Sequence, residues 1–247
     1  MRIPLLILAS LLAACSGKDT SQLRAGPPGL SVARAALESG APDVAARVAE
    51  GVLTRNPHDV DALVSHGDAT AALGRTDDAL ASYTKALAID PNSAGAKMGL
   101  GRLRLTSDPA QAQLLFLSVL EKEPRNAAAL NNLGIARDLQ GDHASAQDAY
   151  RKALGADPSM RGPEVNLALS MALNGQAANA VPLLASLARN VDASPRLRHS
   201  LAAVLMMAGD KDAARRILSQ DLTPEQVERA LLGYEALGTG ALAPVGP

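Results

Sequence analysis

Apolar and polar positions follow three different patterns along the 247-residue chain. An almost unbroken apolar run extends from Leu5 to Leu12, and it is too short to span a bilayer because a spanning helix needs about 20 residues. Residues 16–29 show no apolar periodicity and are rich in Ser, Gly, Lys and Asp. From residue 30 onward, Ala, Leu and Gly recur at near-fixed intervals. These patterns predict a leader, a flexible tether and a helical body built from a repeated unit.

The repeated unit is visible when the chain is aligned with itself so that Leu63 falls on Leu130. The other matching pairs in this self-alignment are Gly67 and Gly134, Gly74 and Gly141, Ala79 and Ala146, Tyr83 and Tyr150, Lys85 and Lys152, Ala86 and Ala153, Leu87 and Leu154, Asp90 and Asp157, and Pro91 and Pro158. A proline series is spaced at about half of the distance from Leu63 to Leu130 along the chain. Its members are Pro57, Pro91, Pro124 and Pro158. The body is therefore predicted to repeat every ~34 residues.

This pattern resembles the tetratricopeptide repeat, a helix-turn-helix unit of about 34 residues. The resemblance implies an all-α solenoid over residues 30–221, closed by a capping helix over residues 222–237 and followed by a disordered tail over residues 238–247. We divide the solenoid into six repeats, at residues 26–59, 60–93, 94–126, 127–160, 161–194 and 195–221. The third repeat is one residue short, and we place the deletion in the turn at residues 106–109.

Each signature residue of the repeat has an expected physical role. A small residue in the first helix, such as Gly67 or Gly134, lets the two helices of a pair approach closely. The aromatic residue of the second helix, such as Tyr83, is expected to fill the wedge between neighbouring repeats. A turn glycine is expected to adopt a left-handed backbone, which only Gly adopts at low cost. The turn glycines are Gly40, Gly74, Gly141, Gly175 and Gly209.

The start of the chain resembles the lipobox of bacterial lipoproteins. Leu12-Ala13-Ala14-Cys15 follows the apolar run, and Cys15 is the single Cys of the chain. The resemblance implies a signal peptide over residues 1–14, lipidation of Cys15 and a tether over residues 15–29. Ser16 at the next position favours the outer membrane, on its periplasmic face. The alternative is a plain signal peptide with a chance Cys.

Composition and charge exclude several other functions. Aromatic residues make up 2% of the chain and Trp is absent, so a base-stacking surface for nucleic acids is not expected. The formal net charge is −1, which gives no general attraction to nucleic acid. The four His residues have no His-Glu-x-x-His spacing, and a single Cys excludes a cysteine-built zinc site. We therefore predict a non-enzymatic protein without a cofactor, metal or small-molecule substrate.

In tetratricopeptide repeats, the first helix of each pair lines a concave groove. By resemblance, the partner-binding positions here are Val64, Asp68, Met98, Arg102, Leu105, Asn131, Asn132, Ile135, Asp138, Val165, Leu169 and Met206. Such a face suits an apolar helix or an extended peptide. Asn131 and Asn132 either hydrogen-bond a peptide backbone, or Asn132 ties adjacent repeats together while Asn131 is solvated. Met98 and Met206 either contact the partner or belong to the core.

A lipid-anchored solenoid of this size is similar to the assembly lipoprotein of Flp (Tad) pili and to the pilotins of type IV pili. That similarity implies an adaptor that binds a secretin, or another pilus or secretion component, and is held at the membrane by its lipid. The alternatives are a scaffold for outer-membrane β-barrel assembly, for cell-wall hydrolases or for polysaccharide export. These alternatives use the same groove and differ in the partner.

Overall fold

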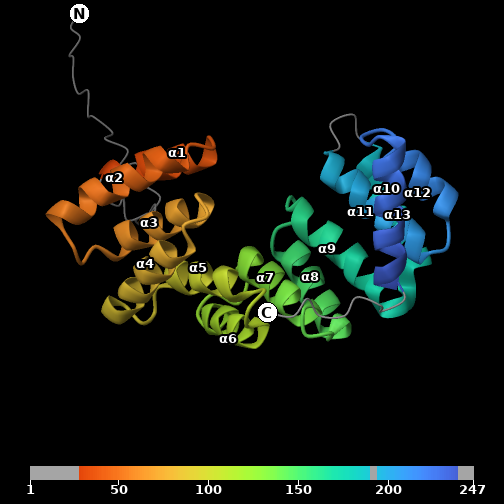
Figure 1. The fold of residues 1–247 in the computed structure, drawn as a ribbon. Coiled ribbons are helices and arrows are strands. Elements are labelled where there is room, and N and C mark those ends of the chain that lie inside the picture. Colours follow the sequence, from red (N-terminus) through yellow and green to blue (C-terminus); the bar gives the residue numbers. More distant parts are fainter. Residues whose placement is uncertain (1–27, 190–193, 239–247) are drawn as a thin grey trace, which may run out of the picture.

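The computed structural model describes residues 28–189 and 194–238, and within these residues the chain is helical with no strand (Figure 1). The helices are α1 (Pro28–Glu38), α2 (Pro42–Arg55), α3 (Val60–Ala72), α4 (Thr76–Ile89), α5 (Ala94–Arg104), α6 (Pro109–Leu120), α7 (Ala127–Asp138), α8 (His143–Ala156), α9 (Arg161–Met171), η1 (Ala172–Gln176), α10 (Ala177–Ala188), α11 (Pro195–Met207), α12 (Lys211–Leu218) and α13 (Pro224–Gly238). The predicted leader, Cys15 and residues 239–247 lie outside the described residues.

The helices form six hairpin pairs that stack in chain order into an open arc, and α13 follows the last pair (Figure 1). Each helix packs against the next one along the chain. First helices of successive pairs also contact one another, as α1 contacts α3, α3 contacts α5, α7 contacts α9 and α9 contacts α11. The expected all-α solenoid of six helical pairs with a terminal capping helix is confirmed.

Glycines end the first helix in five of the six pairs, as the sequence pattern predicts. Gly40, Gly74, Gly141, Gly175 and Gly209 have φ angles of 76°, 74°, 78°, 77° and 86°. These angles lie in the left-handed region, where a Cβ atom is unfavourable. The third pair uses a different turn: Asp108 caps α6 by accepting a hydrogen bond from the backbone N–H of Gln111, and Pro109 follows at the first helical position.

The two ends of the described array differ slightly from the expected boundaries. Helix α1 begins at Pro28, inside the segment 15–29 that the sequence pattern assigns to the tether, and Pro is compatible with the first turn of a helix. Helix α13 begins at Pro224 rather than at residue 222. Thr223 caps it: its Oγ1 accepts from the Gln226 N–H, and the Gln226 side chain accepts from the Thr223 N–H. This reciprocal pair is a capping box.

The aromatic wedges determine how tightly consecutive pairs approach. Tyr83 in α4 is 1% exposed and lies between Gly67 of its own pair and Gly99 of the next. A Cβ atom at Gly67 would lie 2.5 Å from Tyr83 Cε1, and one at Gly99 would lie 2.2 Å from Tyr83 Cζ. Tyr150 meets Gly134 in the same way. The expectation that the aromatic ring fills the space between neighbouring repeats is confirmed for Tyr83.

Candidate protein-binding groove

The predicted groove residues lie on, or at the end of, the first helices of their pairs. Figure 1 shows α3, α5, α9 and α11 toward the inside of the arc, and α4, α6 and α12 toward the outside. Six apolar groove residues are partly exposed, which leaves part of each side chain available to a partner; they are Val64, Leu105, Ile135, Val165, Leu169 and Met206. Met98 is 8% exposed and packs in the same cluster as Phe116, so its side chain belongs to the core.

Two of the predicted charged groove residues bind each other. Arg102 donates from its guanidinium to Asp68 Oδ1 at 2.8 Å, and the Tyr83 hydroxyl donates to the same oxygen at 2.7 Å. The Asp68 and Arg102 side chains are 34% and 46% exposed. Burial raises the pKa of Tyr83 above its ordinary value, and the neighbouring Asp68 carboxylate adds to this effect. The contact joins α3 to α5, so these groove charges already have partners within the array.

Asp138 is the most enclosed carboxylate of the predicted groove. Its side chain is 15% exposed, and it accepts hydrogen bonds from Ser170 Oγ at 2.7 Å and from the Tyr150 hydroxyl at 2.8 Å. His143 Nδ1 also lies 2.8 Å from Asp138 Oδ1. Burial, followed by the Asp138 charge, raises the pKa of Tyr150 above its ordinary value. We call these four residues the Asp138 cluster; it joins α7 and α8 to α9 rather than facing a partner.

The two predicted amide residues have different surroundings. The Asn166 side chain donates from Nδ2 to Asn131 Oδ1 at 2.9 Å, which ties α9 to α7. Asn131 Nδ2 lies 3.5 Å from Asn132 Oδ1. A tie between adjacent repeats was one of the two alternatives for Asn132; in the structure Asn131 makes such a tie. Both side chains stay partly exposed.

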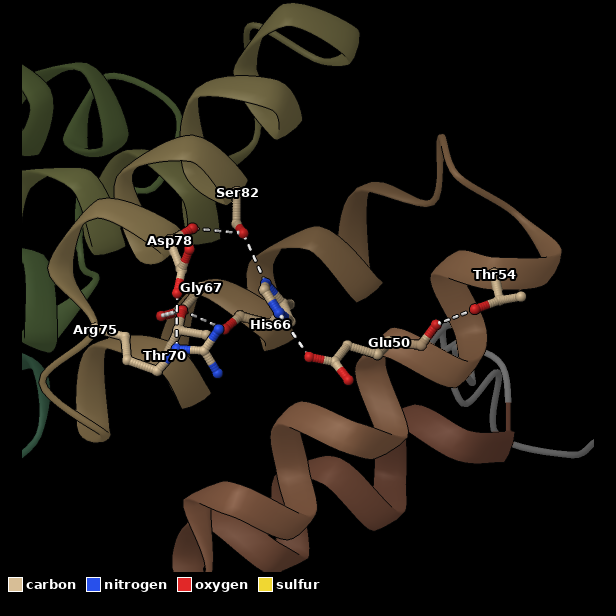
Figure 2. A network of polar contacts seen from close by, with 8 residues as sticks. All are labelled: Glu50, Thr54, His66, Gly67, Thr70, Arg75, Asp78 and Ser82. Carbon is tan, nitrogen blue, oxygen red and sulfur yellow. Dashed lines mark hydrogen bonds and ion pairs between the residues drawn. The ribbon is translucent and has the colours of Figure 1, made fainter.

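Figure 2 shows a polar network that sequence reasoning missed, at the contact between the first two pairs. The Ser82 hydroxyl donates to the Asp78 carbonyl at 2.8 Å, so it accepts from His66 Nδ1–H, also at 2.8 Å. His66 Nε2 then faces Glu50 Oε1 at 3.5 Å. The network joins α2, α3 and α4. The repeat usually carries Leu at the position of His66. This polar residue at an apolar position is the feature of the sequence that could have indicated the contact.

A hollow of about 530 Å³ adjoins the apolar positions at the start of α3 and α5. It is lined by Asp59, Val60, Asp61, Val64, Asp90, Asn92, Ser93, Ala94, Gly95 and Glu123. The carboxylates give this end of the groove a negative charge.

Among the described residues, no group of three or more His, Cys, Asp or Glu side chains is arranged to hold a metal ion. Within the same residues, every helix is too short or too polar to cross a membrane.

Solved structures share this arrangement of helices. PilW, a widely conserved type IV pilus biogenesis factor, superposes with a TM-score of 0.69 over 87% of this chain and 97% of PilW, at 21% identity. PilF of Pseudomonas aeruginosa superposes with a TM-score of 0.66 over 86% of this chain and 96% of PilF, at 17% identity. At these sequence identities, the structural similarity shows that the three proteins share a fold.

Curated relatives match through short stretches of sequence. An FK506-binding protein-like protein of Rattus norvegicus is 40% identical over 83 residues, which is 32% of this chain and 24% of the relative. Cellulose synthase operon protein C of Pseudomonas fluorescens is 31% identical over 149 residues, which is 57% of this chain and 12% of the relative. The chain thus spans a quarter or less of the length of these relatives.

The family comparison covers the array more evenly. The model of the tetratricopeptide repeat matches residues 32–94 and 96–161, just over half of the chain. Proteins with this fold are generally scaffolds for protein–protein interaction rather than catalysts. The stacked hairpins, the turn glycines and this match agree, and the chain belongs to the tetratricopeptide repeat family.

Proposed function

We propose that this protein is a lipid-anchored adaptor that binds a protein partner in its concave groove, as a pilotin-like assembly factor for the secretin of a pilus or secretion system of the Tad (Flp) type. The observation that carries the proposal is the series of partly exposed apolar side chains on successive first helices. The fold likeness to PilW, a pilus biogenesis factor, supports the choice of partner.

The middle of the groove suits an apolar segment because its two predicted carboxylates, Asp68 and Asp138, already have partners. Asp68 is paired with Arg102, and Asp138 accepts from Tyr150 and Ser170. Covering a polar group that lacks a hydrogen-bond partner costs about 1–3 kcal/mol. An apolar helix lying along Ile135, Val165 and Leu169 would remove apolar surface from water without stripping water from unpaired charges. Binding would thus be driven by apolar burial.

A charge placed in the groove tests where the partner binds. We expect Leu169→Glu to abolish co-purification of the partner from solubilised membranes, because the carboxylate would be desolvated against an apolar segment. Leu114→Glu is the matched control, since Leu114 is 61% exposed on the outward-lying α6. Far-UV circular dichroism checks that both variants keep their helices. Loss of the partner in Leu114→Glu and its retention in Leu169→Glu would place the interface on the outer face.

The anchor is tested separately at Cys15. Replacement by Ser removes the thiol that carries the lipid, and we expect Cys15→Ser protein in the soluble periplasmic fraction. Two or more acyl chains are needed for stable anchoring. Ser16→Ala is the control, because it changes the neighbouring residue and keeps the thiol. Membrane fractionation and metabolic labelling with a fatty acid are the measurements; labelled Cys15→Ser protein that still needs detergent for extraction would contradict the anchor.

A second candidate function is a scaffold in polysaccharide export. The observation in its favour is the 31% identity to cellulose synthase operon protein C, which extends over 57% of this chain. The groove and anchor would be the same. Cross-linking in intact cells followed by identification of the captured protein separates the two: a secretin supports the pilotin-like role, and a polysaccharide synthase or export component supports the second.

A further inference from the structure

Three polar residues are linked at the contact of α2, α3 and α4, at positions where the self-alignment of the chain places apolar residues. They are Glu50 for Leu117, His66 for Leu133 and Ser82 for Ala149. The three apolar residues belong to, or pack against, one hydrophobic cluster that includes α6, α7 and α8. The three polar residues are joined through the His66 ring instead, as Figure 2 shows. We call them the His66 network, and the chain itself contains the apolar reference for it.

The distances in the His66 network assign the positions of its protons. The Ser82 hydroxyl oxygen is 2.8 Å from the Asp78 carbonyl oxygen, and a carbonyl cannot donate, so the hydroxyl proton lies between these two atoms. His66 Nδ1 is also 2.8 Å from the Ser82 oxygen, so Nδ1 carries the proton of the neutral ring. His66 Nε2 is then an acceptor that faces Glu50 Oε1 at 3.5 Å, which is longer than an N–H···O hydrogen bond of about 2.7–3.2 Å. The contact between Glu50 and His66 therefore lacks a proton when the ring is neutral.

A proton on His66 Nε2 changes two facing acceptors into a charge-assisted hydrogen bond to Glu50. Glu50 lies in α2 and His66 in α3, so this bond joins the first helical pair to the second. Nδ1 holds its proton in both states of the ring, so the contact with Ser82 stays the same. The Glu50 side chain is 52% exposed, which leaves a path for the proton from water but also screens the new ion pair.

We infer that the His66 network is a proton-sensitive link, which docks the first helical pair more firmly onto the second when the His66 ring is charged. The first pair is the end unit of the described array, and both α1 and α2 contact α3 of the second pair. An end unit of a solenoid is held by one neighbour and opens before the inner units. Protonation of His66 therefore lowers the fraction of molecules in which the first pair is undocked.

The surroundings of the ring determine which quantity reports the link. Within the described chain, Glu50 is the charged side chain in contact with the ring. Charged groups elsewhere on the packed helices are exposed or paired with each other, among them Arg34 and Glu38 on α1, Asp43 with Arg47 on α2, and Arg75 with Asp78 at the start of α4. Burial disfavours a charged ring, whereas the Glu50 carboxylate favours it. Because these two effects oppose each other, the coupling between Glu50 and His66 reports the link better than overall stability does. None of the three residues is a predicted groove residue, so the link does not depend on the proposed function.

Nitrogen-15 NMR of the imidazole rings in the purified protein tests the proton positions. At about pH 8 an ordinary imidazole is neutral, and we expect His66 to carry its proton on Nδ1. The signal of His66 is identified by its loss in His66→Asn. A neutral ring with the proton on Nε2 would overturn the inference, because Glu50 would then have a donor at every pH.

Hydrogen exchange followed by mass spectrometry measures the opening constant of the first pair, from peptides of α1 and α2. Glu50→Met keeps the side-chain length and the helix propensity but removes the carboxylate. We expect the opening constant to rise about two- to fivefold at about pH 5.5, where the ring is charged, and not to rise at about pH 8. In a His66→Asn background, whose amide can still donate to Ser82, Glu50→Met should have no effect at either pH.

A second carboxylate of α2 is the matched control. Asp43 is bound to Arg47 at 3.2 Å, and an Arg stays charged at both pH values, so Asp43→Asn should have the same effect at both. An equal rise for Glu50→Met at both pH values, no rise at about pH 5.5, or the same rise in the His66→Asn background would overturn the inference. If circular dichroism shows that His66→Asn does not fold, the tautomer of the native ring and the comparison of Glu50→Met at the two pH values decide the matter.

Discussion

At the scale of single residues, the absence of a Cβ atom decides where the aromatic wedges can pack. Gly99 in α5 faces the Tyr83 ring so closely that a Cβ would lie 2.2 Å from Cζ, and the ring is 1% exposed, so it has no space to move into. Gly51 in α2 is also helical, yet a Cβ there would meet nothing within 4 Å. Comparing the two positions therefore distinguishes two effects. At Gly99 the packing requires a residue without a Cβ atom, whereas at Gly51 glycine only destabilises the helix.

We expect opposite effects of Ala at these two positions. Gly99→Ala gains helix propensity of about 1 kcal/mol, but forcing a methyl group against a buried ring costs about 1–3 kcal/mol. The predicted result is a net loss of stability. Gly51→Ala is the matched control and is expected to raise the free energy of unfolding by up to about 1 kcal/mol. Urea unfolding monitored by circular dichroism measures both. A stabilised Gly99→Ala would mean that the ring is not confined.

At the scale of helical elements, two tyrosines connect the wedge to a carboxylate on a first helix. Tyr83 donates to Asp68 and Tyr150 donates to Asp138, and each carboxylate also binds a residue of the next pair, Arg102 or Ser170. Phe116, the wedge between them in sequence, has no hydroxyl to donate. The acceptors are not equivalent positions, because Asp68 aligns with Ile135 when Leu63 is aligned with Leu130.

This difference shows what the sequence could and could not predict. The spacing of Gly67, Tyr83 and Gly74 is periodic, so it predicts the helices, the turns and the wedge. The polar partners are not periodic: Ser170 meets Asp138, and Asn166 meets Asn131, only because α9 lies beside α7 of the preceding pair. The periodic pattern therefore predicts that Asp68, Arg102 and Asp138 lie on first helices, as they do, but it could not predict that they bind partners within the array.

The buried tyrosines predict a loss of stability at alkaline pH. Their pKa is raised in the fold, chiefly by burial, whereas an unfolded tyrosine ionises near pH 10. The folded state thus holds more protons, so this contribution is complete below about pH 10 and is lost as the pH rises toward the folded pKa. We expect a loss of about 1.4 kcal/mol per tyrosine between pH 9 and pH 11.

Urea unfolding across this pH range provides the measurement. In Tyr83→Phe/Tyr150→Phe the ring volume stays and the ionisable group is removed, so we expect a flatter dependence, with Tyr234 still contributing because burial raises its pKa too. The double variant is also expected to be less stable at neutral pH, since each carboxylate loses a donor. A dependence as steep as that of the native chain would show that the two phenols do not control it.

At the scale of the whole molecule, the array must end in a helix that covers its last apolar surface. Without such a helix, a solenoid exposes the contact that the next repeat would have buried. Helix α13 supplies Val227, 2% exposed, and Leu231, 0% exposed, to the C-terminal core, which is the cluster of buried residues from Ala168 in α9 to Leu231. Leu232, the next residue of α13, is 64% exposed. Arg198 in α11 pairs with Asp221 just before α13, and this ion pair lowers the pKa of the Asp221 carboxyl.

Substitutions at two neighbouring leucines of α13 test the capping role of this helix separately from its formation. Leu231→Ala is expected to cost about 2–5 kcal/mol, because it leaves a cavity in the C-terminal core. Leu232→Ala changes the same residue type one position away and is expected to change stability by less than about 0.5 kcal/mol. Calorimetry and light scattering measure the effect. Since the helix propensity change is the same in both variants, equal effects would mean that α13 is not needed to close the array, and the C-terminal core would then have to be completed by another copy or by the partner itself.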